Sequence, residues 1–142
     1  PGDGSGGGHR HRAVRWSPLS PDAARLLALG VAAARIGLGV TAVVAPTVVS
    51  RPWIGSEAEG AGAKVLGRSL GGRDVALGLG PVLADRRRRP IRGWVEAAAL
   101  ADLVDATATL AAFRSLPAKG RWIVLASAGG AAAAGALAAA SL

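Results

Sequence analysis

The residues best suited to chemistry in this chain are charged side chains that lie inside long apolar stretches. They are three arginines and four carboxylates: Arg35, Arg68, Arg73, Asp74, Glu96, Asp102 and Asp105. A charge at mid-bilayer costs several kcal/mol unless it is paired or hydrated. Because the two signs are nearly balanced, we expect one intramembrane network of ion pairs, or a hydrated path for protons or ions.

Depth along each apolar stretch, at about 1.5 Å per helical residue, indicates which charges can meet. Asp102 and Asp105 are three residues apart and share one helix face, where two carboxylates repel each other unless cations neutralise them. We therefore predict the pairs Arg73–Asp102 and Arg68–Asp105. At about 100° per residue, Arg68, Arg73 and Asp74 point in three directions, so one helix face cannot hold them all.

Several kinds of catalytic or metal site are excluded by residue type. The chain has no cysteine, and its two histidines, His9 and His11, lie in a Gly-rich N-terminal stretch. No histidine is therefore available to activate a serine in the rest of the chain. The Gly-rich run at residues 67–72 lacks the Gly-Lys-Ser/Thr of a phosphate loop. We expect no enzymatic activity, no cofactor and no metal site.

The net charge of +8 does not indicate a nucleic-acid partner. Five arginines form one short block at residues 86–89 and 92, and the other basic residues are scattered, often inside apolar runs. Aromatic residues, which would stack on bases, make up only 4% of the chain. We expect a lipid bilayer as the partner and no nucleic acid.

Four apolar segments must position these charges. They cover residues 27–50, 62–84, 93–113 and 121–141, and each has roughly the 20 residues that span a bilayer core. Residues 1–21 combine Gly, Ser, Pro and Arg with too little apolar surface to fold, which predicts a disordered tail. The sequence thus predicts an all-α fold, with an integral membrane four-helix bundle over residues 22–142.

Tryptophan placement supports these segments. All four tryptophans lie at predicted segment boundaries: Trp16, Trp53, Trp94 and Trp122. Indole rings favour the membrane interface, where one end of the ring is apolar and the other is wet. We therefore interpret them as interface anchors, two on each side of the membrane.

Orientation follows from the distribution of Lys and Arg in the short connections. The tail carries Arg10, Arg12 and Arg15, and the second connection carries the arginine block at residues 86–92. Both regions fall on one side of a four-span protein, so we predict a multi-pass protein of the cell membrane with both termini cytoplasmic. The third connection, which holds Arg114, Lys119 and Arg121, fits this assignment less well.

Small residues are spaced for close helix contact in the second segment. Gly67 and Gly71 form a GxxxG pair, a pattern that lets two helix backbones approach closely. It fits packing within one chain or a contact between two copies, so a homo-oligomer or a larger membrane complex stays open.

Two short motifs carry a family resemblance. They are Gly72-Arg73-Asp74, in the stretch from Gly67 to Gly80, and Asp102-Leu103-Val104-Asp105. Over residues 25–140 the chain resembles the uncharacterised small four-helix integral membrane proteins of actinobacteria. This resemblance implies a helical membrane fold and carries no activity with it.

Three interpretations follow. The first is a non-enzymatic membrane protein whose Arg and Asp network is structural, or a subunit of a membrane assembly. The second is a transporter or a proton- or ion-conducting protein, with Arg73, Asp102 and Asp105 along a hydrated path. The third is a soluble Ala-rich helical bundle.

Overall fold

The computed structural model describes residues 17–142, and this part of the chain is helical without any strand. The elements are α1 (Pro21–Val44), α2 (Pro46–Ile54), the 3-10 helix η1 (Gly55–Glu59), α3 (Ala61–Arg86), α4 (Arg92–Ala111) and α5 (Ala118–Ser141). The prediction of an all-α fold is confirmed. The predicted disordered tail, with Trp16 and both histidines, lies outside the described residues as far as residue 16.

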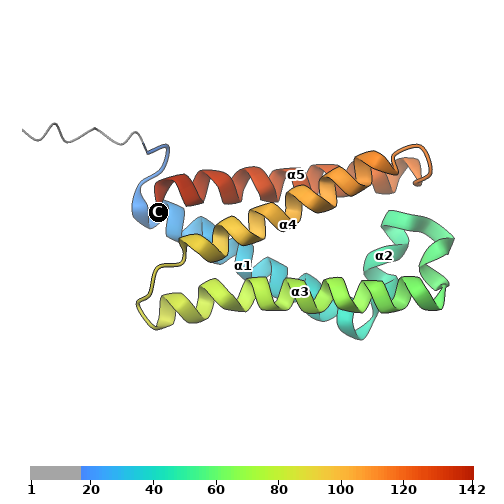
Figure 1. Ribbon diagram of the computed structural model, residues 1–142, viewed down its shortest axis with the longest axis horizontal. Helices are drawn as coiled ribbons and strands as arrows, with labels where there is room; N and C mark the ends of the chain where they lie inside the picture. Colours follow the sequence, from blue (N-terminus) through green and yellow to red (C-terminus); the bar gives the residue numbers. More distant parts are fainter. Residues whose placement is uncertain (1–16) are drawn as a thin grey trace, which may run out of the picture.

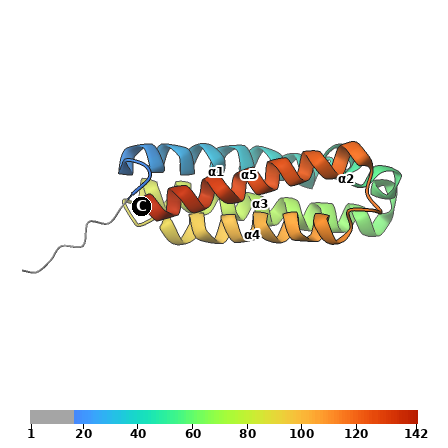
Figure 2. The same ribbon diagram turned by 90° about the horizontal axis from the view of Figure 1, so that it is seen from above.

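Four long helices lie side by side along the molecule, and α2 lies at one end of them (Figures 1 and 2). The opposite end, here called the terminal end, holds the start of α1, the α3–α4 connection and the C-terminus. Two contacts join its parts. The Leu19 N–H donates to Ser141 Oγ at 3.2 Å, and an Arg25 Nη donates to Asp85 at 2.7 Å. We call the other end the α2 end.

The first predicted segment, residues 27–50, is wrong as a single helix, because the chain changes direction at Pro46. Proline has no N–H for the helix ladder, and it pushes the preceding residue out of the helical region. Ala45 accordingly has φ −131° and ψ 69°, and α2 begins at Pro46. At its other end α1 begins six residues earlier than predicted, because Ser20 caps it by accepting from the Ala23 N–H at 3.2 Å.

The other three long helices lie within three residues of their predicted limits. Helices α1, α3, α4 and α5 have 24, 26, 20 and 24 residues. At about 1.5 Å per residue each is roughly 30 Å long or longer, enough for a bilayer core. Among the described helices, α1 and α5 are long and apolar enough by composition to cross a membrane.

Glycine sets the spacing of the α1–α3 pair. A Cβ atom added at Gly71 would lie 2.7 Å from the carbonyl oxygen of Gly39, and one at Gly78 would lie 2.7 Å from that of Ala32. Such backbone contact is possible only without a side chain.

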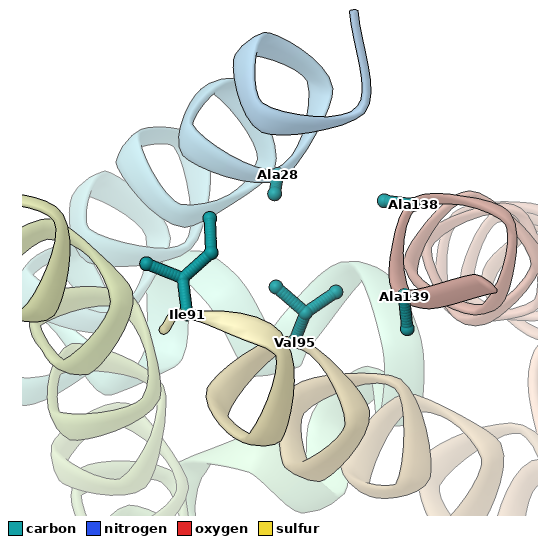
Figure 3. Close-up of a cluster of buried hydrophobic side chains, with 5 residues drawn as sticks. All are labelled: Ala28, Ile91, Val95, Ala138 and Ala139. Carbon is teal, nitrogen blue, oxygen red and sulfur yellow. The ribbon is translucent and has the colours of Figure 1, made fainter. Parts of the chain in front are cut away.

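A small apolar cluster lies at the terminal end. There Ala28 of α1 meets Ala138 and Ala139 of α5, together with Ile91 and Val95 at the start of α4 (Figure 3).

The distribution of apolar side chains is the reverse of that in a water-soluble bundle. Among the buried hydrophobic residues of the described chain, only Ile91 and Val95 are larger than alanine. Large apolar side chains lie instead on the outside, on every long helix: they include Leu26, Leu38, Val44, Val65, Leu66, Leu100, Leu103, Leu110, Ile123 and Leu137. The bundle is thus packed with small residues and coated with large ones.

Candidate functional site

Arg35 lies at the centre of the bundle and joins three helices. From α1 its guanidinium donates to Asp74 of α3 at 2.8 Å and to Asp102 of α4, with a longer contact of 3.5 Å to the Ala98 carbonyl. Only 7% of Arg35 is exposed, and Asp102 is equally buried. A buried guanidinium of this kind requires carboxylate partners, and the geometry supplies two.

Arg73 makes a second connection between α3 and α4. Its guanidinium holds Asp105 with two hydrogen bonds, of 2.7 and 3.1 Å, in the parallel arrangement that an arginine and a carboxylate favour. It also donates to Asp74 Oδ1 at 3.2 Å, the same oxygen that accepts from Arg35. The side chains therefore form a continuous chain, here called the charge network, in the order Asp102, Arg35, Asp74, Arg73 and Asp105.

The positive and negative charges of the charge network are not equal in number. It contains two guanidinium groups and three carboxylates, so it carries a net charge of −1 when all five are ionised. The carboxylates of Asp74 and Asp102 keep 14% and 10% of their side-chain surface exposed. The second oxygen of each carboxylate has no hydrogen bond within residues 17–142. The surplus of negative charge is thus reachable from within the bundle.

The two ion pairs predicted from depth differ from the observed ones. Asp102 pairs with Arg35 in place of Arg73, and Asp105 pairs with Arg73 in place of Arg68. The cause is the position of α1. Because this helix runs over residues 21–44, Arg35 is its fifteenth residue of 24, beyond its middle and level with Asp74.

Two predicted members lie outside the charge network. Arg68 is exposed on α3 and forms no ion pair with the described part of the chain. Glu96 is exposed and accepts from Arg92, one turn earlier on α4, at 2.7 Å. The prediction that one face of α3 cannot hold Arg68, Arg73 and Asp74 together agrees with the position of Arg68 outside the charge network.

A cavity of about 410 Å³ lies beside the charge network, on the side of the α2 end. Its wall takes residues from all five α-helices, including Leu38 and Ala42 of α1, Val49 and Trp53 of α2, Leu70 of α3, Ile123 and Ala131 of α5, and every member of the charge network. Most of that wall is aliphatic or aromatic, and the charge network is its principal polar part. The volume falls in the range of small-molecule sites.

The cavity is closed at one end and open at its side. Arg35 and Asp102 also line a void of about 20 Å³ towards the terminal end, so their ion pair separates the two spaces. Leu38 and Ile123 line the main cavity and are 53% and 48% exposed. The cavity therefore reaches the molecular surface between α1 and α5.

Three buried N–H groups beside the cavity lack a hydrogen-bond partner among the described residues. They are the Nε groups of Arg35 and Arg73 and the indole Nε1 of Trp53. All three atoms are covered by surrounding protein, so they offer no accessible donor to a molecule in the cavity. The polar side chains of this wall are the two guanidinium groups and three carboxylates of the charge network, together with Ser50 and Ser127.

The three described tryptophans lie near the ends of the helices. Trp94, in the first turn of α4, packs its ring against Gly80 of α3 at the terminal end. Trp53 lies near the end of α2, and Trp122 lies in the second turn of α5, whose Gly120 packs against Trp53. Trp122 is 61% exposed and meets the Phe113 ring edge to face at 5.2 Å.

The GxxxG pair packs inside the chain. Gly71 faces Gly39 of α1, and a Cβ atom at Gly67 would lie 3.1 Å from Pro46 Cβ. The GxxxG motif was compatible with packing within one chain or with a contact between two copies. Packing within one chain accounts for both glycines.

Sequence reasoning missed three features of the site. It did not anticipate helix α2, which supplies Trp53 to the cavity, nor the Arg25–Asp85 pair at the terminal end. It also missed Arg121, which lies over the Phe113 ring at 4.2 Å. A signal was present for the first of these, since Pro46 cannot continue the hydrogen-bond ladder of α1 and is suited to the first turn of a new helix.

Within residues 17–142, no group of three or more His, Cys, Asp or Glu side chains is arranged to hold a metal ion. The comparisons add no further assignment, since no family model, curated protein or solved structure matches this chain. Function must therefore be argued from the distribution of side chains, the charge network and the cavity.

Proposed function

We propose that this chain is a non-enzymatic integral membrane protein in which α1, α3, α4 and α5 cross the bilayer. In this proposal the charge network holds the four spans together. The observation that carries it is the outward position of the large apolar side chains around a core of alanine, glycine and ion pairs. In water such continuous apolar surface is rare on a monomer, whereas in lipid it is the expected exterior.

Hydroxyl groups support the same conclusion. Each Ser and Thr of the four long helices donates to a carbonyl of its own helix, three or four residues earlier: Thr41, Ser69, Thr107, Thr109, Ser127 and Ser141. The exposed ones among them have no need of water as a partner. In a hydrocarbon environment an unsatisfied hydroxyl is costly, so this pattern favours a bilayer.

The charges have the distribution that lipid requires. Arg35, Arg73 and the three aspartates point into the bundle, where each has a partner of opposite sign. Most of the remaining Lys and Arg side chains lie in the connections or in the end turns of the helices, and Arg68, the eighth residue of α3, is an exposed exception. This leaves the middle of the outer surface apolar, as a spanning bundle needs.

The proposed orientation puts the terminal end in the cytoplasm. That end carries the arginine block at residues 86–89 and 92, and the sequence adds three arginines in the tail. The α2 end carries fewer basic residues: Arg51 and Lys64, which lie 3.9 and 3.6 Å from Glu59, and Arg114, Lys119 and Arg121 of the third connection. The excess of Lys and Arg thus favours the terminal end as the cytoplasmic side.

Reporter fusions test this topology. A reporter after Leu142 and another inserted at Arg88 should both report the cytoplasm, and one inserted at Ser56 of η1 should report the outside. A periplasmic or extracellular signal from Leu142 or Arg88 would contradict the orientation. Recovery of the chain in the soluble fraction without detergent would instead favour a soluble helical bundle.

Transport or ion conduction is the second candidate. It is favoured by one observation, that Asp74, Asp102 and Asp105 line a cavity that reaches the molecular surface. Purified protein in liposomes that contain a pH-sensitive dye distinguishes the two roles. A proton or ion flux that Asp102→Asn abolishes, in a protein that still folds, would favour conduction over a structural role in a membrane assembly.

A further inference from the structure

We infer that the cavity between the α1–α3 pair and the α4–α5 pair binds a monovalent organic cation with apolar substituents, such as an aromatic or alkyl ammonium ion. This goes beyond a structural role for the bundle, because it assigns a ligand to the space beside the charge network. The inference rests on volume, wall composition and net charge.

The volume and shape suit a small molecule. At about 410 Å³ the cavity is far larger than a site for a water molecule or a bare metal ion. Leu38 and Ile123 at its exposed edge allow entry from the side of the bundle. A ligand that enters there from a bilayer must itself be partly apolar.

The charge of the wall selects the sign of that ligand. Three carboxylates face two guanidinium groups, and Arg35 and Arg73 already have all their ionic partners within the charge network. A bound anion would add to the negative surplus in a place of low dielectric constant, whereas a monovalent cation would neutralise it. The accessible oxygens of Asp74 and Asp102 are the groups that would contact it.

The uncharged residues of the wall favour a ligand with apolar substituents. Val49, Leu70 and Ile123 provide apolar contact, and the indole of Trp53 lies in the same wall. Aromatic faces attract organic ammonium groups, and tryptophan does so best. A strongly hydrated inorganic cation would gain little from this wall, so the combination favours an organic cation.

Binding of benzyltrimethylammonium to the full chain in non-ionic detergent micelles tests the inference. Isothermal titration calorimetry measures it, with empty micelles as the blank. Benzyl sulfonate, an anion with a similar ring, and neopentylbenzene, the uncharged isostere, serve as competitors. We expect saturable binding of the cation, no competition by the anion and at most weak competition by the isostere.

Three variants separate the effect of wall charge from that of cavity shape. Asp102→Asn removes the surplus charge but leaves Arg35 paired with Asp74, and it should weaken cation binding by about tenfold or more. Ala131→Leu fills the cavity without changing its charge and should abolish binding, whereas Ala133→Leu, at an exposed site of α5 outside the cavity wall, should not. Circular dichroism verifies folding, and the Ala131 and Ala133 pair decides the question if Asp102→Asn does not fold.

The inference is overturned if the folded wild-type chain shows no heat above the blank at millimolar cation. It is also overturned if the anion competes as well as the cation, or if Ala131→Leu binds as tightly as Ala133→Leu. The measurement does not depend on topology. A chain that binds the cation but is recovered without detergent would contradict the membrane proposal alone.

Discussion

Replacing Arg35 with leucine should be among the most damaging single changes in this chain. Only 6% of the Arg35 side chain and 10% of the Asp102 side chain are exposed, and within residues 17–142 Asp102 has no other cationic partner. Arg35→Leu therefore leaves a buried carboxylate uncompensated, at a cost of about 3–5 kcal/mol. A single hydrogen bond between membrane helices is worth only about 0.6 kcal/mol on average, so the stranded charge dominates.

Replacing Asp102, the partner of Arg35, should lower the free energy of unfolding by less. Asp102→Leu leaves Arg35 bound to Asp74 at 2.8 Å, so the loss is that of one charged hydrogen bond, about 1.5–3 kcal/mol. In the double variant both charges are gone, while Arg73 still holds Asp74 and Asp105. We expect the double variant to be more stable than Arg35→Leu alone, because Asp102 is no longer left unpaired.

Equilibrium unfolding in mixed micelles measures these effects, with far-UV circular dichroism followed as sodium dodecyl sulfate is added. The matched control is the Arg73→Leu and Asp102→Leu cycle, since these two side chains form no hydrogen bond or ion pair with each other. We expect a coupling free energy of about 1–3 kcal/mol for Arg35 with Asp102 and a smaller one for Arg73 with Asp102. The reverse order would refute the observed pairing and restore the one inferred from depth.

Two further predictions test the packing and the outer surface. Gly71→Ala should lower stability by about 1–3 kcal/mol, because its Cβ would lie 2.7 Å from the Gly39 carbonyl oxygen, whereas Gly72→Ala, with open space at its Cβ, should be tolerated in the same unfolding assay. Leu100→Lys, on the exposed face near the middle of α4, should reduce membrane insertion much more than Trp94→Lys in the first turn of that helix, since a lysine at the bilayer centre costs about 2.5–3.5 kcal/mol. Equal amounts of membrane-integrated protein for both lysine variants would contradict the proposed depth.

The long helices could be predicted from the sequence because their apolar runs have nearly the same length as the elements. The exception was α1, where both limits were displaced by six residues in the same direction. Its actual start depends on a Ser20 side chain, and its end depends on the restriction that Pro46 places on Ala45. Both are local signals, and the second was readable in the sequence, since a proline within the last five residues of a predicted span interrupts its helix.

The members of the charge network could be predicted better than its connections. Residue type alone identified Arg35, Arg73 and the three aspartates, because charges within apolar runs need partners, but it also included Arg68 and Glu96, which lie outside the network. The pairing depends on how far each helix is shifted along its axis and which helices are neighbours, and neither is encoded locally. Moving α1 by six residues shifts Arg35 by about 9 Å along the helix axis, and this error was enough to assign Asp102 to Arg73.

The charge network and the cavity are two aspects of one feature of the packing. Within the α1–α3 pair, glycines bring the backbones into contact, and in the α4–α5 pair Gly135 lies against Ala99. Between the pairs, beside the cavity, the long side chains of Arg35 and Arg73 reach across to α4. Ion pairs there take the place of close packing, which leaves room beside them for a molecule. Stability and binding should consequently depend on the same few charged residues, while alanine in place of an exterior side chain outside the cavity wall, such as Leu66 or Leu110, should affect neither strongly.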